Sequence, residues 1–300
     1  MEAIITIVGF LGAGKTTLLK HLMHSYTTKG WSPFIILNDY ENAYIDAQQF
    51  ATQIDSKNIK PLSGSCICCN GIEELRNMVN RIPERINGIT LIEANGTSDA
   101  SSLMEFLGVG ILDRFLPPIQ ISVVNVKNWQ KREEHNELEI SQIQVSSLLV
   151  LTHLEDVTEG RKTEVIKNLK KVNPTAQIVT TDTLDVFLLP EIVPSSNIAK
   201  EFDHYKAHWS SSSVDLPDLP SEKYIHYICE ALPKSILRVK GCTKIGDSDS
   251  YTFFERIPDG EVFIRPFNGV PFTGSKLLTI GPGSSPEILV KAITASLYKS

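Results

Sequence analysis

The stretch Gly9-Phe10-Leu11-Gly12-Ala13-Gly14-Lys15-Thr16-Thr17 decides the fold of this 300-residue chain. It matches the phosphate-loop pattern G-x-x-x-x-G-K-T, and it lies between an apolar run at residues 4–8 and a helical pattern. In such a loop the glycines let backbone N–H groups surround phosphate oxygens, the lysine reaches the β and γ phosphates, and the threonine hydroxyl ligates Mg²⁺. The pattern predicts a nucleoside triphosphate site formed by Gly9, Gly12, Ala13, Gly14, Lys15, Thr16 and Thr17.

Short apolar runs rich in β-branched residues recur through the first two thirds of the chain. They lie at residues 4–8, 34–37, 89–92, 121–126, 148–151 and 178–181. These runs lack the alternation of half-exposed strands, and helical patterns such as those at 17–23, 72–82 and 161–171 separate them. Strands that alternate with helices predict an α/β fold with a doubly wound, mostly parallel sheet.

The composition changes between residues 193 and 221, where Ser, Pro, Asp and His dominate and predict a linker. Beyond it, a helical pattern at 222–232, four strand-like runs and a closing helix at 286–297 predict a small antiparallel α+β domain. We therefore expect a nucleotide-binding domain over residues 1–192, a linker over 193–221 and a smaller C-terminal domain over 222–300.

Composition excludes several classes of protein. A chain with 42% hydrophobic and 21% charged residues is typical of a globular protein, and its net charge of −6 argues against nucleic acid and anionic membranes as partners. No apolar run reaches the roughly 18 residues of a membrane span, and no signal peptide is evident, so we expect a cytoplasmic protein. An odd number of cysteines, five, favours free thiols.

Three of these cysteines, Cys66, Cys68 and Cys69, lie within the stretch GSCICC. Thiolates at i, i+2 and i+3 in a turn before a helix can converge on one cation, and the helix N-terminus favours the thiolate form. Three sulfur ligands leave one coordination position open, which suits an ion that is passed on. Buried small residues or a redox pair remain alternative interpretations of the cluster.

The apolar run at 89–92 ends in Glu93, and Gly96 follows three residues later. In a nucleotide-binding sheet this carboxylate emerges beside Mg²⁺ and the γ phosphate, where it can hold a water molecule. We expect Gly96 to contact the γ phosphate through its N–H group. The alternative is that Glu93 is a helix-capping or solvated residue.

Together these motifs resemble a known family. The phosphate loop, the CICC cluster, Glu93 with Gly96, Asn173-Pro174 and Arg238-Val-Lys-Gly241 occur in an order that resembles the CobW-type (cobalamin synthesis W protein-like) GTPases, metallochaperone relatives of the nickel-insertion GTPases. The resemblance covers nearly the whole chain. It implies a GTPase domain with a C-x-C-C metal motif, a smaller C-terminal domain and GTP-dependent delivery of zinc or another transition metal to a client metalloprotein. A homodimer is an open expectation.

Two segments depart from the family pattern. The segment Asn38-Asp39-Tyr40-Glu41 resembles the family's Asn-Glu-Phe-Gly-Glu, but Asp39 replaces a glutamate and Asn42 falls where a second glutamate would be. We expect Asp39 in the catalytic site, and the fourth metal ligand is either water or a carboxylate from this stretch. The guanine-binding Asn-Lys-x-Asp appears as Thr152-His153-Leu154-Glu155. The carboxylate survives only as glutamate, so we expect a weak preference for GTP over ATP.

The sequence thus predicts a slow, Mg²⁺-dependent P-loop nucleoside triphosphatase with Lys15, Glu93 and Asp39 as catalytic residues. Because Asp39 and Cys66 are both expected near the γ phosphate, hydrolysis can change the metal site and release the ion. A rival hypothesis is a nonhydrolysing nucleotide or metal sensor that docks on a client. A small-molecule kinase is a third, but the chain lacks an Arg-rich lid and a kinase leaves the cysteines unexplained.

Overall fold

The structure is a computed structural model of the chain. It describes residues 1–38, 50, 54–62, 72–96, 98, 100–107, 110–195, 211–236, 238–257, 259–267, 269–271, 274–281 and 283–298. The chain divides into two compact units, residues 1–39 with 53–204 and residues 40–52 with 205–300. No described helix is long and apolar enough to cross a bilayer.

A parallel sheet of seven strands forms the first unit, in the order β3-β2-β4-β1-β5-β6-β7. Its strands are β1 (Ala3–Val8), β2 (Ser32–Asn38), β3 (Ile59–Leu62), β4 (Gly88–Glu93), β5 (Ile119–Asn125), β6 (Leu148–Thr152) and β7 (Gln177–Thr180). The central strand β1 pairs with β4 on one side and with β5 on the other. The predicted α/β class with a parallel sheet is confirmed, whereas the short strand β3 was not predicted.

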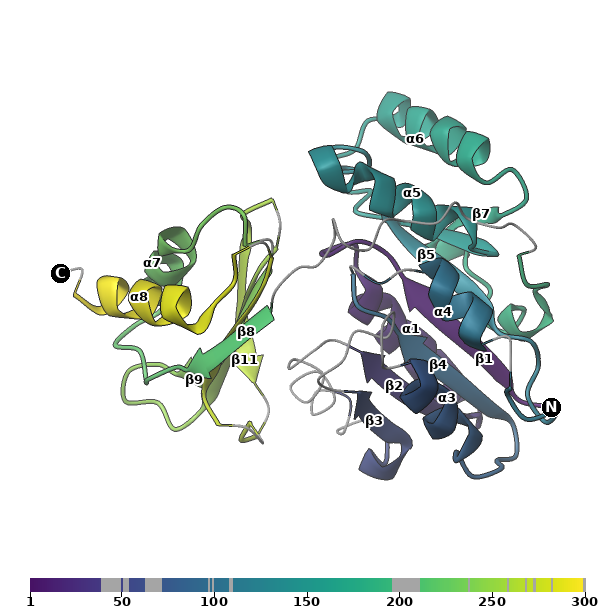
Figure 1. Ribbon diagram of the computed structural model, residues 1–300, viewed down its shortest axis with the longest axis horizontal. Helices are drawn as coiled ribbons and strands as arrows, with labels where there is room; N and C mark the ends of the chain where they lie inside the picture. Colours follow the sequence, from purple (N-terminus) through teal and green to yellow (C-terminus); the bar gives the residue numbers. More distant parts are fainter. Residues whose placement is uncertain are drawn as a thin grey trace. The chain divides into compact units, whose positions relative to one another are not determined.

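Helices cover this sheet and complete its hydrophobic core. They are α1 (Lys15–Thr28), α3 (Ile72–Asn80), α4 (Ala100–Leu107), α5 (Asn136–Gln144) and α6 (Glu159–Val172). Helices α3 and α4 lie in front of the sheet in the view of Figure 1 and share one cluster of buried side chains with β1, β2 and β4. Side chains of α5 and α6 join a second cluster with β5 and β6. Apolar side chains of α1, such as Leu19 and Leu22, are buried as well.

The parallel direction of the strands determines where functional residues gather. The carboxyl ends of β1, β4, β5 and β6 lie at one edge of the sheet, because these strands are neighbours that run the same way. The phosphate loop follows β1, Glu93 ends β4 and Thr152 ends β6. Three segments that are distant in the sequence therefore meet at this edge.

The second unit contains an antiparallel sheet of five strands in the order β11-β10-β9-β12-β8. Its elements are β8 (Ser211–Asp215), α7 (Lys223–Ala231), β9 (Arg238–Lys244), β10 (Tyr251–Arg256), β11 (Val262–Phe267), β12 (Lys276–Ile280) and α8 (Pro286–Leu297). Helices α7 and α8 lie side by side on one face of this sheet (Figure 1), and their apolar residues pack on Val239, Phe254 and Leu277.

One expectation is corrected here. Strand β8 lies inside the range 193–221 that composition predicted to be a linker, and it pairs with β12 from Ser211 to Asp215. Serine-rich composition is typical of linkers, but the partner strand supplies the hydrogen bonds that order this segment. Residues 211–215 are therefore part of the second sheet.

Candidate functional site

The phosphate loop, residues 9–17, leaves the carboxyl end of β1 and leads into α1. Gly9 has a φ of 141°, and a Cβ at this position would lie 2.5 Å from the carbonyl oxygen of Val123, so only glycine fits. Gly14 precedes α1 in the left-handed conformation with a φ of 97°. No described side chain caps this helix, so its first N–H groups are oriented toward the loop, where an anion can accept from them.

Lys15 lies inside this loop rather than in solvent. Its side chain is buried, and Nζ donates hydrogen bonds to the carbonyl oxygens of Gly9 at 2.9 Å and Phe10 at 3.4 Å. These bonds hold the positive charge at the start of the loop, where it follows β1. A cation in this position is what the motif needs to bind the β and γ phosphates.

Thr16 and Glu93 contact each other at the end of the loop. The Thr16 hydroxyl donates to Glu93 Oε1 at 2.7 Å, and the Glu93 side chain is buried. A hydroxyl oxygen and a carboxylate are ligand types that Mg²⁺ prefers. The structure therefore brings together the two residues that the sequence predicted, from separate motifs, to act at the metal and the γ phosphate.

Gly96 packs directly on the phosphate loop. A Cβ at this position would lie 2.6 Å from Leu11 Cδ2 and 2.8 Å from the Leu11 nitrogen. Gln142 of α5 donates from Nε2 to the carbonyl oxygens of Gly96 at 3.2 Å and Ser98 at 3.3 Å, and it is 1% exposed. A buried amide therefore holds the segment after β4 against the loop. The sequence did not predict a role for Gln142, because helix α5 itself was not predicted.

The predicted base-binding segment also contacts the phosphate loop. Thr152 Oγ1 donates to the carbonyl oxygen of Ala13 at 2.8 Å. His153 Nδ1 lies 3.2 Å from that hydroxyl, and its ring carbon Cε1 lies 3.9 Å from the position of a Cβ on Gly14. Glu155 is exposed. Thr152 thus ties β6 to the phosphate loop, a contact that the sequence analysis did not predict.

A third neighbour holds the aromatic residue of the loop. The Arg132 guanidinium lies 4.3 Å from the centroid of the Phe10 ring, and its Nε donates to Glu139 Oε1 at 2.9 Å. Burial raises the pKa of the Glu139 carboxyl, while the charge of Arg132 acts in the opposite direction. The backbone N–H of Gln130 donates to the other carboxylate oxygen at 3.1 Å. This group fixes the segment after β5 beside the loop, and the sequence did not predict it.

Several predicted site residues lie outside the described part of the chain. These are Asp39, Cys66, Cys68 and Cys69. Within the described residues, no group of three His, Cys, Asp or Glu side chains is arranged to hold a metal ion. Cys229 and Cys242 are described and buried, and burial raises the pKa of both thiols to about 12. These two cysteines are therefore neutral packing residues at physiological pH.

Comparisons of sequence and structure relate this chain to known proteins. Residues 3–180 match the family model described as CobW/HypB/UreG, nucleotide-binding domain. The chain is similar to the zinc chaperone YjiA of Escherichia coli (strain K12), with 26% identity over 99% of both chains. It is also similar to zinc-regulated GTPase metalloprotein activator 1 of Dictyostelium discoideum, with 25% identity over 62% of this chain and 46% of the relative. The solved structure of Zn(II)-bound YjiA GTPase from E. coli aligns over 99% of both chains with 19% identity and a TM-score of 0.45.

Proposed function

The chain belongs to the CobW/HypB/UreG family, and on this premise we propose that it hydrolyses GTP and delivers a zinc ion to a client metalloprotein. The observation that carries the proposal is the contact between Thr16 and Glu93 beside the buried Lys15. A hydroxyl, a carboxylate and an ammonium group at one phosphate loop are the groups that hold Mg²⁺ and a triphosphate. The names of the relatives, a zinc chaperone and a zinc-regulated GTPase metalloprotein activator, support zinc as cargo and GTP as nucleotide.

Each residue of the loop has a proposed role in hydrolysis. Lys15 exchanges the carbonyl oxygens of Gly9 and Phe10 for the β and γ phosphates. Thr16 and Glu93 hold Mg²⁺, which neutralises charge on the phosphates when it is bound. Glu93 also orients the attacking water, and the N–H of Gly96 contacts the γ phosphate. The backbone N–H groups from Gly12 to Thr17 surround the phosphate oxygens.

The guanine base is proposed to lie on the segment from Thr152 to Glu155. Glu155 accepts the N1–H and N2–H₂ donors of guanine, and the His153 ring stacks on the base in place of a lysine stem. Thr152 contributes by fixing this segment to the phosphate loop through Ala13. Because its hydroxyl donates to the loop, we do not expect Thr152 to replace the amide of the family's asparagine at the base.

The cargo site is proposed on Cys66, Cys68 and Cys69, with the fourth position open for transfer to the client. Asp39 follows β2 directly in the sequence, and the cysteines lie between β3 and α3. Both segments therefore start from strands of the sheet that carries the phosphate loop. We propose that GTP hydrolysis changes these segments and thereby lowers the affinity for zinc.

Phosphate release under single-turnover conditions tests this function against a nonhydrolysing sensor. The chain is purified without an affinity tag, loaded with zinc, and mixed with limiting GTP and Mg²⁺. We expect release of one phosphate per bound GTP. We also expect that GTP addition starts the transfer of zinc to a chelator. Lys15→Ala should abolish both effects. Lys29→Ala, an exposed lysine just after α1, is the control and keeps both activities. Binding of GTP without phosphate release contradicts the proposal and favours the sensor.

A further inference from the structure

A cavity of about 1080 Å³ opens between α3 and the strands β2 and β3. Ser32 and Phe34 of β2 line it, together with the short 3-10 helix η2 (Ser56–Asn58) that precedes β3. Ser32 is the first residue of its strand, and Arg85, another wall residue, precedes β4. The cavity therefore lies toward the amino ends of these strands, whereas the phosphate loop follows a carboxyl end. It is separate from the proposed nucleotide site.

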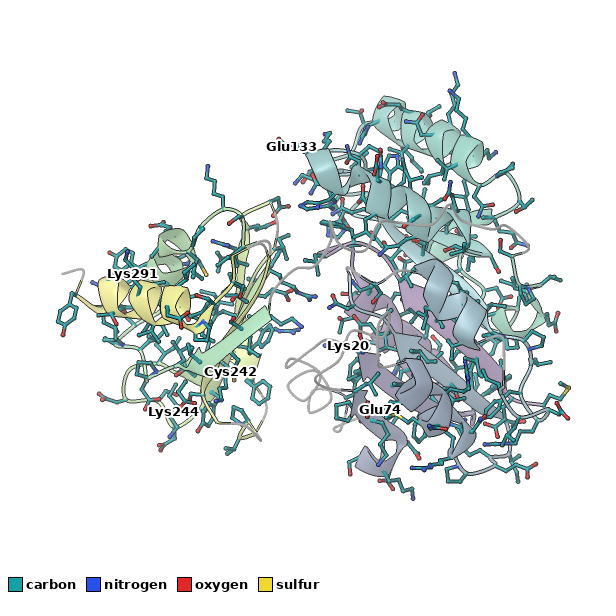
Figure 2. The ribbon with its side chains drawn as sticks, viewed as in Figure 1. Lys20, Glu74, Glu133, Cys242, Lys244 and Lys291 are labelled. Carbon is teal, nitrogen blue, oxygen red and sulfur yellow. The ribbon has the colours of Figure 1, made fainter. Side chains whose placement is uncertain are left out.

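One stripe of α3 and its last turn forms a wall of the cavity. The stripe contains Glu74, Asn77, Met78 and Arg81, which are spaced i, i+3, i+4 and i+7 and so share one side of the helix. Glu74 is labelled on α3 in Figure 2. The adjacent side of the same helix sends Leu75 and Val79 into the core of the sheet. One side of α3 therefore packs in the core, while the stripe lines the cavity.

Positive charge dominates the rim of the cavity. Four cationic residues line it, and Glu74 is the one acidic residue among the described lining. The cations are Lys57, Lys60, Arg81 and Arg85. The whole chain carries a net charge of −6, so this local excess does not follow from composition.

Two of these cations are available to a ligand. Lys60 and Arg81 are exposed, and neither side chain forms an ion pair within the described part of the chain. Arg85 is committed elsewhere, because it is paired with Glu2 and donates to the carbonyl oxygen of Ser32 at 2.9 Å. Lys57 has an exposed partner, Asp55, at 2.9 Å. Exposed ion pairs of this kind contribute little to stability, so Lys57 can leave Asp55 for an anionic ligand.

The base of the cavity is apolar. Phe34 and Ile82 are buried in the core of the sheet, and Met78 is half-buried against the same core. The Arg85 guanidinium lies 5.5 Å from the centroid of the Phe34 ring and closes one end of this surface. An apolar base with a few polar groups at its rim is the usual construction of a site for a small organic ligand.

We propose that this cavity binds an amphipathic organic anion. Its carboxylate or phosphate group lies between Lys60 and Arg81, and its apolar body rests on Phe34, Met78 and Ile82. The volume, about 1080 Å³, slightly exceeds the range of about 300 to 1000 Å³ that is typical of such sites, so the cavity has room for such a ligand. The site is distinct from the phosphate loop, because the two share no residue.

The test uses 8-anilinonaphthalene-1-sulfonate, an aromatic anion whose fluorescence rises in apolar surroundings, as the probe. The full chain is titrated in the presence of saturating GDP and Mg²⁺, so that the nucleotide site is filled. We expect saturable binding of one probe per chain. The double variant Lys60→Glu/Arg81→Glu should lower the affinity for the probe by at least about tenfold, because the anion then meets two negative charges. The matched control Lys167→Glu/Lys170→Glu changes two exposed lysines on α6 and should bind the probe as the parent does.

Two further arms separate charge from packing. Met78→Trp fills the apolar base and should also remove the probe, while GDP affinity within twofold of the parent confirms that each variant is folded. The uncharged analogue N-phenyl-1-naphthylamine should bind at least tenfold more weakly than the sulfonate. Absence of saturable binding, equal binding by the Lys60→Glu/Arg81→Glu variant, or equal binding of the uncharged analogue overturns the proposal.

Discussion

The Thr16 hydroxyl donates a 2.7 Å hydrogen bond to the Glu93 carboxylate, which joins the first turn of α1 to the end of β4. The two residues are 77 positions apart in the sequence. One belongs to the loop that binds phosphates, and the other is the candidate for orienting water. A change at either residue is therefore expected to affect the other, so the two must be separated by substitutions that preserve the hydrogen bond.

Glu93→Gln is expected to abolish most hydrolysis while the nucleotide still binds. The glutamine amide oxygen can still accept from Thr16, so the contact survives, but the negative charge that orients water and Mg²⁺ is lost. We expect phosphate release to slow by about 10²-fold or more, with GDP affinity within threefold of the parent. Single-turnover phosphate release and calorimetric titration with GDP measure the two effects. Unchanged phosphate release would remove Glu93 from the catalytic residues.

Gln142→Leu is expected to slow hydrolysis although Gln142 lies on α5, outside the phosphate loop. Loss of its amide leaves the buried carbonyl oxygens of Gly96 and Ser98 without these donors, which costs about 1–3 kcal/mol and loosens the segment after β4. We expect phosphate release to fall about tenfold and GDP affinity to stay the same, because that segment is proposed to contact only the γ phosphate.

Ser146→Ala is the matched control for Gln142. The Ser146 hydroxyl donates to the main-chain carbonyl of Gln142 at 2.8 Å and forms no hydrogen bond with the described residues of the segment after β4. Its loss should lower the free energy of unfolding by about 1 kcal/mol without slowing phosphate release. If both variants slow phosphate release equally, Gln142 contributes only to the stability of the fold and has no specific role in hydrolysis.

Zinc is expected to protect three of the five thiols from alkylation. Cys229 and Cys242 stay unreacted in the folded protein at pH 8, because burial raises both pKa values to about 12 and iodoacetamide attacks the thiolate. Without zinc, Cys66, Cys68 and Cys69 should be alkylated. Mass spectrometry of the alkylated peptides identifies the modified residues. A protein with all three changed to serine should lose its zinc, and retention of one zinc per chain would move the cargo site elsewhere.

The nucleotide preference is expected to be weak. Glu155 can accept both guanine donors, but its extra methylene shifts the carboxylate, and lost or lengthened hydrogen bonds cost about 0.5–1.5 kcal/mol each. Discrimination between GTP and ATP should therefore be one to two orders of magnitude lower than with an intact Asn-Lys-x-Asp segment. Calorimetric titrations with both nucleotides and Mg²⁺ measure it, and Glu155→Ala should erase what remains. Equal or tighter binding of ATP by the parent chain would contradict guanine as the preferred base.

Most of the strands that could be predicted from the sequence are buried, and burial requires mostly apolar residues. Strands β1, β4 and β5 are mostly apolar and buried along their whole length, because helices cover the sheet. Strand β3 was not predicted because it is short and contains Lys60 and Pro61. It lies at the edge of the sheet, where the N–H donor that proline lacks is not needed. Helix α5 was missed because it buries polar residues such as Glu139 and Gln142.

The site shows the same division between local and distant information. The phosphate loop is a contiguous motif, so its residues and their chemistry could be predicted from the sequence. The contacts that hold it, Thr152 to Ala13 and Arg132 to Phe10, join residues that are more than a hundred positions apart. Spacing along the chain contains no signal for such pairs, and only the order of the strands brings them together.

That order also governs how the molecule is assembled during synthesis. Strand β4 pairs with β1 on one side and with β2 on the other, so it joins two parts of the sheet that have no strand pairing with each other. A nascent chain that ends before residue 88 therefore holds β1 and β2 without the strand between them. Glu93 is the last residue of that strand, so the pairing of β4 joins β2 to β1 and also brings the carboxylate to Thr16. A product truncated before residue 88 thus contains the phosphate loop but lacks both the strand between β1 and β2 and the carboxylate that contacts Thr16.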